Sequence, residues 1–152
     1  MTFQIIKWIH VLFAISALGA NITYGIWISR ASKNPDVLPF TLRNVKLIDD
    51  RVANPAYILL LISGLLMVWL TDFPLTVPWL LISLIIYTGL ALIGFLAYTP
   101  TLKRQIELAE QKKIDSAEYQ QVARRATVLG GVLVLFAVVI VFMMVVKPAL
   151  WA

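Results

Sequence analysis

The stretch KWIHVLFAISALGANITYGIW, residues 7–27, is apolar enough to cross a membrane as a helix, yet it carries a lysine, a histidine, an asparagine and a tyrosine. A transmembrane helix needs about 20 mainly apolar residues to cross about 30 Å of hydrocarbon. Three further apolar runs follow, and the four predicted spans cover about residues 3–27, 55–71, 78–99 and 127–147. No run alternates with the two-residue period of a membrane β-strand. The sequence therefore predicts an all-α polytopic membrane protein, a single antiparallel bundle of four transmembrane helices formed by residues 1–152.

The overall composition supports this class. Of the 152 residues, 61% are hydrophobic and only 14% are charged, which is outside the usual range of soluble domains. The chain contains no cysteine, so disulfides, thiolate catalysis, iron–sulfur ligation and thioether attachment of haem are excluded. It also lacks a nucleophile–base motif, a phosphate-binding glycine loop and a zinc motif. Composition thus leaves the question of enzymatic activity open.

The positive charges are distributed unevenly along the chain. The net charge is +5, and of the 13 lysines and arginines all but Lys7 and Lys147 lie between spans one and two or between spans three and four. Basic connections of membrane proteins stay in the cytoplasm. We therefore expect both basic loops in the cytoplasm and both termini outside, in a bacterial cytoplasmic (inner) membrane. The basic excess then reflects topology and contact with the lipid bilayer, and no nucleic acid partner is expected.

The last connection is expected to be helical and to project from the membrane. Its sequence contains good helix formers with a break near Asp115 and Ser116, either of which can cap a new helix. A helix over residues 116–147 would be about 48 Å long at 1.5 Å per residue, longer than the membrane is thick. We therefore predict a cytoplasmic helical hairpin that extends spans three and four. At the start of span two, Pro55 predicts a kink or a new helix start.

The polar residues of the first span share one face. On an ideal helix, Lys7, His10, Asn21 and Tyr24 fall within an arc of about 100°, and polar groups facing lipid are costly. The same ideal-helix geometry places Asp50 on one face with the polar residues of span two. Predicted interior polar residues are Asn21, Tyr24, Asn54, Tyr57, Ser83 and Tyr87. Hydrogen bonds between helices, worth about 0.6 kcal/mol each, account for most of these residues.

His10 is the only histidine, and it lies about 7 Å below the outer boundary, from five residues at 1.5 Å each. Met67 and Met144 lie at a comparable depth. Histidine and methionine together are ligands of some haems, and a thioether sulfur also suits Cu(I). The candidate cofactor site is therefore His10, Met67 and Met144, with haem b the first candidate and copper, on His10, the second. In the alternative interpretation, His10 bonds a carbonyl or hydroxyl group, and the methionines only fill gaps.

Two segments carry a family resemblance, WIHVLFAISALGA (residues 8–20) and LIDDRVANPAYILLLISGLLMVW (residues 47–69). They resemble an uncharacterised family of small bacterial four-helix integral membrane proteins, which implies a fold and no activity. The chain is also distantly similar to the membrane-embedded haem-containing protoporphyrinogen oxidases and to copper-resistance membrane proteins of the D type. Both have an early histidine in the first span, and in the oxidases it is a haem ligand, a role that the resemblance gives to His10. The oxidases have a lysine on span three, whereas span three of this chain has no basic residue before Lys103, beyond Pro100; this difference argues against the oxidase activity.

Three functions remain open. The first is a redox role with haem or copper at His10, where a bis-histidine haem would require a homodimer. The second is passive transport or metal passage, because no Asp or Glu lies within a span and Asp50 and Asp72 lie at boundaries, whereas coupled carriers need intramembrane charges. The third is assembly with a membrane protein partner through the cytoplasmic hairpin.

Overall fold

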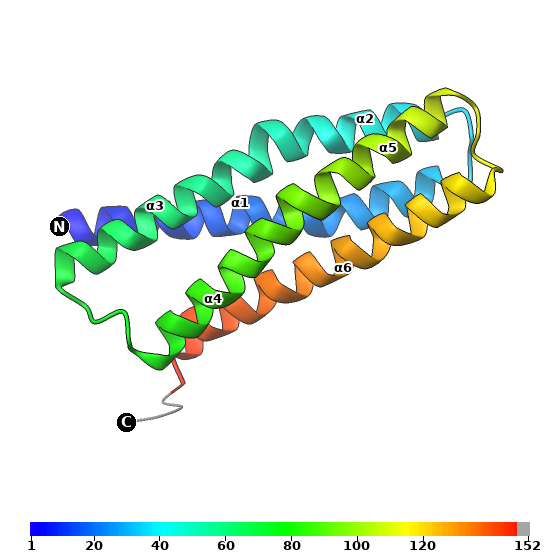
Figure 1. Cartoon of the computed structure of the whole chain (residues 1–152). Helices are drawn as coiled ribbons and strands as arrows, with labels where there is room; N and C mark the ends of the chain where they lie inside the picture. The colour runs from blue at the N-terminus through cyan, green and yellow to red at the C-terminus, as the bar shows by residue number, and fades with distance from the viewer. Residues whose placement is uncertain (149–152) are drawn as a thin grey trace.

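The computed structural model describes residues 1–148, and it is helical where the sequence predicts spans. Four helices in this part of the chain are long and apolar enough to cross a membrane, which confirms the predicted all-α membrane fold. The elements, in chain order (Figure 1), are α1 (Thr2–Ala31), α2 (Leu38–Ile48), the π-helical turn η1 (Asp49–Ala53), α3 (Asn54–Thr71), α4 (Pro78–Ile93), the π-helical turn η2 (Gly94–Tyr98), α5 (Thr99–Glu110) and α6 (Ala117–Val146).

The two ends of the molecule differ in charge. One end carries the loops of residues 32–37 and 111–116, and we call it the basic end; the other carries the N-terminus, the loop of residues 72–77 and the end of α6 (Figure 1). At the basic end α5 and the start of α6 form the predicted hairpin, and the Ser116 hydroxyl caps α6 by accepting a hydrogen bond from the Tyr119 N–H at 3.1 Å. Helix α2, which was not predicted to join this hairpin, packs along α5.

The most tightly packed apolar core lies at the basic end, beyond the predicted spans. Leu42, Leu102 and Leu108 are completely buried there, whereas many leucines, isoleucines and valines of α1, α3, α4 and α6 are exposed. The hydrophobic effect explains this difference, because water drives leucines together, whereas lipid tails are as apolar as leucine. The extension at the basic end is therefore a water-type core attached to a membrane-type bundle.

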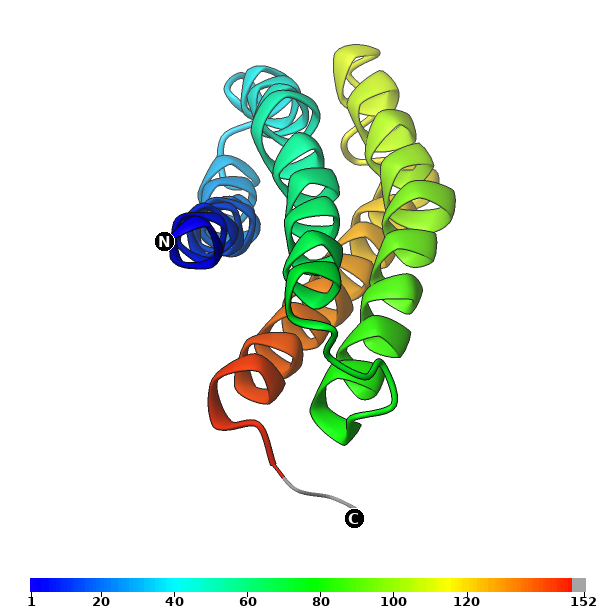
Figure 2. The same cartoon turned by 90° about the vertical axis from the view of Figure 1, so that its left-hand side faces the viewer.

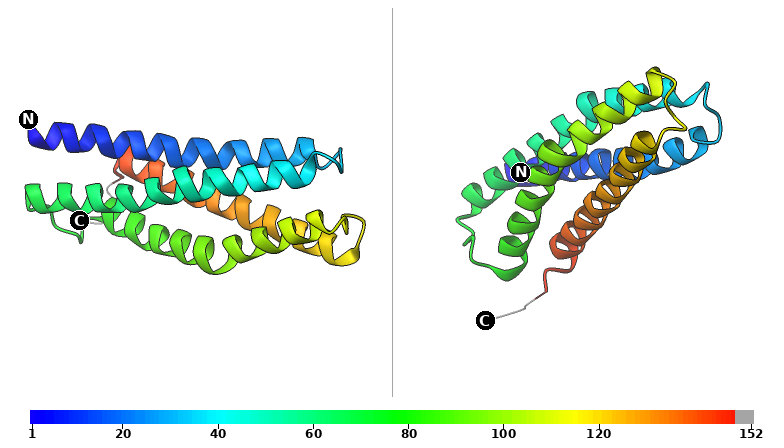
Figure 3. Two further views of the ribbon diagram at one scale, coloured as in Figure 1. Left: turned by 90° about the horizontal axis from the view of Figure 1, so that it is seen from above. Right: turned by 45° about the vertical axis from the view of Figure 1, so that its right-hand side comes forward.

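The membrane-spanning helices form two pairs rather than an evenly packed bundle. Helix α1 packs against α3, and α4 packs against α6, whereas no close backbone contact joins α3 to α4 or to α6 in the described part of the chain. Viewed toward the N-terminal end (Figure 2), α1 lies beside α3 and α6 beside α4. The pairs diverge toward that end (Figure 3), and α1–α6 and α2–α5 contacts join them.

Two continuous helical rods, one formed by α2, η1 and α3 and the other by α4, η2 and α5, each contain one π-helical turn just before an X-Pro pair. The turn η1 ends before Asn54 and Pro55, and η2 ends before Thr99 and Pro100. Proline has no N–H to donate, and its ring clashes with the carbonyl four residues earlier. A wider turn relieves that clash, and the N–H groups of Asn54 and Thr99 bond five residues back, to the carbonyls of Asp49 and Gly94. The kink or new helix start expected at Pro55 is thus a π turn inside a continuous helix.

Candidate functional site

His10 contacts the neighbouring helix α3 through one edge of its ring. Its Nδ1 lies 2.9 Å from the hydroxyl oxygen of Ser63, a buried residue. That hydroxyl has a single proton, and it lies 2.6 Å from the carbonyl oxygen of Leu59, so it donates there. The Ser63 oxygen can then accept from Nδ1–H of His10, and these contacts assign the ring to the Nδ1–H tautomer. In neutral His10, Nε2 is left with a free lone pair.

Gly64 allows this close approach of the imidazole to α3. A Cβ atom at residue 64 would lie 3.2 Å from Cε1 of His10 and 3.7 Å from its Nδ1. The first of these distances is tighter than nine in ten real Cβ contacts. Small residues generally let transmembrane helices approach, and here the glycine makes room for a specific ring.

The two candidate methionines lie on different helix pairs. Met67 follows Ser63 by four residues on α3, so it lies on the same face, one turn closer to the end of the molecule that carries the N-terminus of the chain. Met144 is half-buried on α6, which has no close backbone contact with α3. The structure therefore does not bring both methionines together at His10. No cluster of three or more His, Cys, Asp or Glu side chains that could hold a metal ion occurs within residues 1–148.

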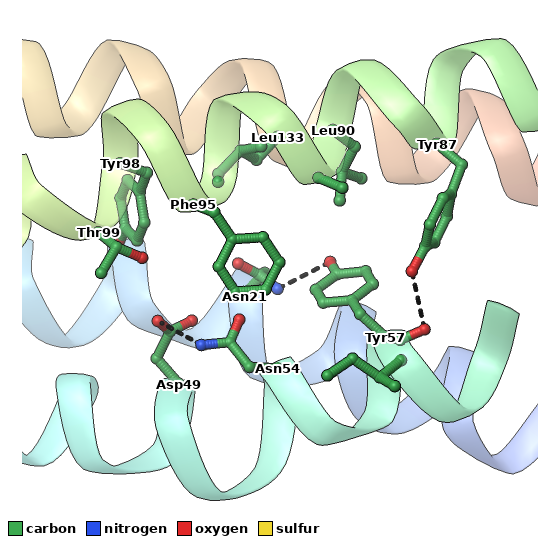
Figure 4. A pocket seen from close by; sticks show the side chains of 13 residues that line it. Asn21, Asp49, Asn54, Tyr57, Tyr87, Leu90, Phe95, Tyr98, Thr99 and Leu133 are labelled. Carbon is green, nitrogen blue, oxygen red and sulfur yellow. Dashed lines mark hydrogen bonds between the residues drawn. The ribbon is translucent and has the colours of Figure 1, made fainter. Parts of the chain in front are cut away.

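Deeper in the bundle, the predicted interior residues form hydrogen bonds between helices. The Asn21 side-chain amide donates to the Ala17 carbonyl and to the Tyr57 hydroxyl, both at 2.9 Å. The Tyr87 hydroxyl donates to the Tyr57 main-chain carbonyl at 2.8 Å. Through Tyr57 these bonds link α1, α3 and α4 (Figure 4).

The other predicted interior residues behave differently. Ser83 is buried and donates at 2.6 Å to the Trp79 carbonyl of its own helix. The Tyr24 side chain is only 3% exposed, and its hydroxyl has no hydrogen-bond partner among the described residues. Asn54 donates to the carboxylate of Asp49 at 3.4 Å.

A pocket lined by both polar and apolar side chains lies between the two helix pairs, beside both π turns (Figure 4). Its volume is about 40 Å³, enough for two or three water-sized occupants. The apolar part of its lining includes Leu90, Phe95 and Leu133. The polar lining consists of Asn21, Asp49, Asn54, Tyr57, Tyr87, Tyr98 and Thr99.

Asp49 is the charged residue of the pocket, and the sequence did not predict it. The ideal helical phase placed Asp50 inward, and the structure corrects this: Asp49 is 5% exposed, whereas Asp50 is exposed and forms an ion pair with Lys46. The cause is η1, because a π turn takes more residues per turn and so rotates the residues before it relative to α3. The Asn54–Pro55 pair was the available signal for that change of phase.

The comparisons with known proteins give a family and nothing finer. A family model described as "Predicted integral membrane protein (DUF2269)" matches residues 4–148. No curated protein and no solved structure matches the chain.

Proposed function

This chain belongs to the DUF2269 family of predicted integral membrane proteins, and we propose that it is a small redox protein of the bacterial cytoplasmic membrane. In this proposal Nε2 of His10 is a ligand of a b-type haem, with copper as the second candidate. The observation that carries the proposal is the arrangement of His10, Ser63 and Leu59, which leaves the lone pair of Nε2 free.

That arrangement has the chemistry of a metal-binding histidine. Such histidines almost always donate their other ring N–H to an acceptor, which fixes the tautomer and the ring orientation. Here the Ser63 hydroxyl is the acceptor, and the main-chain carbonyl of Leu59 orients that hydroxyl in turn. A bound haem supplies one-electron transfer, while the protein sets its ligation and polarity.

The donor set of this chain fits a haem held without covalent bonds. No cysteine is available for thioether attachment, so the haem would be of the b type. Met67, on the same face of α3 as Ser63, supplies a thioether from the same helix pair as His10. A second copy of the chain would instead supply a second His10. The pocket beside Asp49, at about 40 Å³, is far smaller than a porphyrin and is not the haem site.

The distribution of charge supports an orientation for this redox site. Lysines and arginines concentrate at the basic end, whereas Lys7 and Lys147 lie toward the other end. By the positive-inside rule the basic end faces the cytoplasm. His10 then lies near the outer face of the cytoplasmic membrane, and both ends of the described chain lie outside.

An absorption spectrum of the purified protein tests the proposal. We expect a Soret band that shifts on reduction with dithionite, in protein expressed with haem supply or reconstituted with hemin. His10→Ala should abolish the band. Ser63→Ala should keep haem but shift its reduction potential, because it removes the partner of Nδ1. Ser16→Ala is the matched control, since the Ser16 hydroxyl is exposed and bonds only the Leu12 carbonyl of its own helix.

Two results would overturn the proposal. One is a protein that is colourless as purified, takes up no hemin and contains no copper by elemental analysis. The other is a haem band that survives His10→Ala unchanged. Either result would leave His10 as a hydrogen-bonding residue of the α1–α3 contact and would favour assembly with a membrane partner.

A further inference from the structure

We infer that the pocket between the two π turns is a binding site for a monovalent cation, Na⁺ or K⁺, held by side-chain oxygens of Asp49, Asn21 and Asn54. This site is separate from His10. Asn21 follows His10 by eleven residues on α1, which is about 16 Å along a helix. The inference therefore does not depend on the proposed redox role.

The hydrogen bonds of the two asparagines leave their oxygens free. Asn21 uses its side-chain N–H groups on the Ala17 carbonyl and the Tyr57 hydroxyl. Asn54 turns its side-chain nitrogen toward Asp49 Oδ2, at 3.4 Å. Each side chain has one acceptor oxygen left, and neither oxygen has a donor among the described residues. Figure 4 shows Asn54 turned toward Asp49, and Asn21, Phe95 and Tyr98 also line the pocket.

The carboxylate of Asp49 gives this region a negative charge, and none of the ion pairs among the described residues involves it. Asp49 is almost fully buried, and its one described hydrogen bond, from Asn54, is long. Lys46, the nearest preceding basic residue of the same rod, is paired with the exposed Asp50 instead. A buried charge is costly unless a counter-charge accompanies it. A monovalent cation supplies one charge of the required sign, whereas a divalent ion would leave an uncompensated positive charge.

The ligand type and the volume both suit a small hard cation. Carboxylate and amide oxygens favour hard cations, whereas transition metals favour imidazole and thiolate. The pocket of about 40 Å³ holds one such ion with one or two waters.

The backbone around the pocket resembles the cation sites of membrane carriers in one respect. Those sites use interrupted helices near the bundle interior, and π turns often mark functional sites. Here Asp49 lies in η1, and Tyr98 and Phe95 lie in η2, so the two interrupted rods face the same pocket. The interruption also determines which carboxylate enters, because without it Asp50 would have pointed inward.

Ion-dependent thermal unfolding of the full chain tests this inference. The purified protein in detergent is unfolded in NaCl, KCl and choline chloride at equal ionic strength. A ligand that binds only the folded state raises Tm in a saturable way, so we expect such a rise with Na⁺ or K⁺ and none with choline. Asp49→Asn should abolish the rise. Asp50→Asn, which removes the adjacent exposed carboxylate, should retain it and serves as the matched control.

Two further measurements keep the test decisive if Asp49→Asn does not fold. Asn54→Ala should weaken the apparent affinity by about tenfold, as expected when one oxygen ligand is lost. Equilibrium binding of ²²Na⁺ to the unmodified protein should be saturable and should compete with K⁺. His10→Ala should leave the ion dependence intact, which separates this site from the proposed redox site.

Three results would refute the inference. The first is identical stability in choline and in both alkali-metal salts, without saturable ²²Na⁺ binding. The second is an ion dependence that survives Asp49→Asn. The third is stability that follows pH alone, which would show that a proton neutralises Asp49.

Discussion

The hydrogen bond from Tyr87 to the Tyr57 carbonyl gives the sharpest prediction about how the two helix pairs are held together. It joins α4 to α3 at 2.8 Å, although these two helices have no close backbone contact in the described part of the chain. Tyr87→Phe removes the hydroxyl and keeps the ring. The variant therefore isolates one bond between the pairs with little change in packing.

The expected loss of stability follows from the kind of bond removed. Hydrogen bonds between transmembrane helices contribute about 0.6 kcal/mol on average and about 1.7 kcal/mol at most. The bond of Tyr87 should lie in the upper half of this range, because no neighbouring α3–α4 backbone contact compensates for its loss. The Tyr57 carbonyl lies inside α3, so its helical hydrogen bond remains and no buried acceptor is left bare. We therefore expect a decrease of about 1–1.5 kcal/mol in the free energy of unfolding.

Two measurements check this value. Reversible unfolding in mixed micelles gives the free energy, with Thr88→Val as the control, because the Thr88 hydroxyl bonds only the Leu84 carbonyl of its own helix. Spin labels at Leu70→Cys and Leu81→Cys give the separation of α3 and α4, and the absence of native cysteine makes both sites unique. The distance distribution should broaden in Tyr87→Phe. A stability change no larger than that of Thr88→Val, with an unchanged distribution, would refute the role assigned to Tyr87.

Three further predictions concern other parts of the structure. Gly25→Ala should stabilise the protein by up to about 1 kcal/mol through helix propensity, because a Cβ atom there meets nothing within 4 Å. Gly64→Ala should lose this gain because its Cβ atom crowds His10, and the free energy of unfolding of both variants decides the comparison. Leu102→Ala should cost about 2–5 kcal/mol because Leu102 is fully buried, whereas Leu65→Ala, at an exposed position of α3, should change stability by less than about 0.5 kcal/mol in the same assay. A cysteine introduced at Lys33, in a basic-end loop, should be labelled by an impermeant thiol reagent only after the cytoplasmic side is opened, and labelling of intact spheroplasts would reverse the proposed orientation.

The sequence was informative wherever one physical rule decides the outcome. Hydropathy located the four membrane-spanning helices because a span must be apolar along its whole length. The pair Asp115 and Ser116 located the start of α6, and in the structure Ser116 is the cap, because its hydroxyl accepts from a free N–H of the first turn. The polar face of α1 followed from helical periodicity, and in the structure Asn21 and His10 both contact α3.

The sequence was less informative where the backbone departs from an ideal helix. Asp50 was placed inward on a phase of 100° per residue, but η1 changes that phase and buries Asp49 instead. Both X-Pro pairs were visible in the sequence, yet a proline predicts either a kink, a new start or a wider turn. The pairing of helices was hidden for a different reason. Lipid gives apolar faces no reason to choose a partner, so the separation of α3 from α4 leaves little trace in hydropathy.

The division between the two cores explains how such a small bundle can hold its helix pairs apart. Water-driven packing of Leu42, Leu102 and Leu108 fixes the pairs at the basic end. Near the π turns, buried side chains of both pairs, among them Tyr24 and Leu133, belong to the same core, and the Tyr87 hydroxyl adds a polar link. An occupant of the pocket beside Asp49 contacts residues of both pairs, because the lining comes from α1, η1 and α3 as well as from α4, η2 and α6. The binding energy of such an occupant would therefore act on the separation of the pairs. Because His10 lies where that separation increases, an ion bound between the π turns would be coupled to the environment of His10 through the two helix pairs.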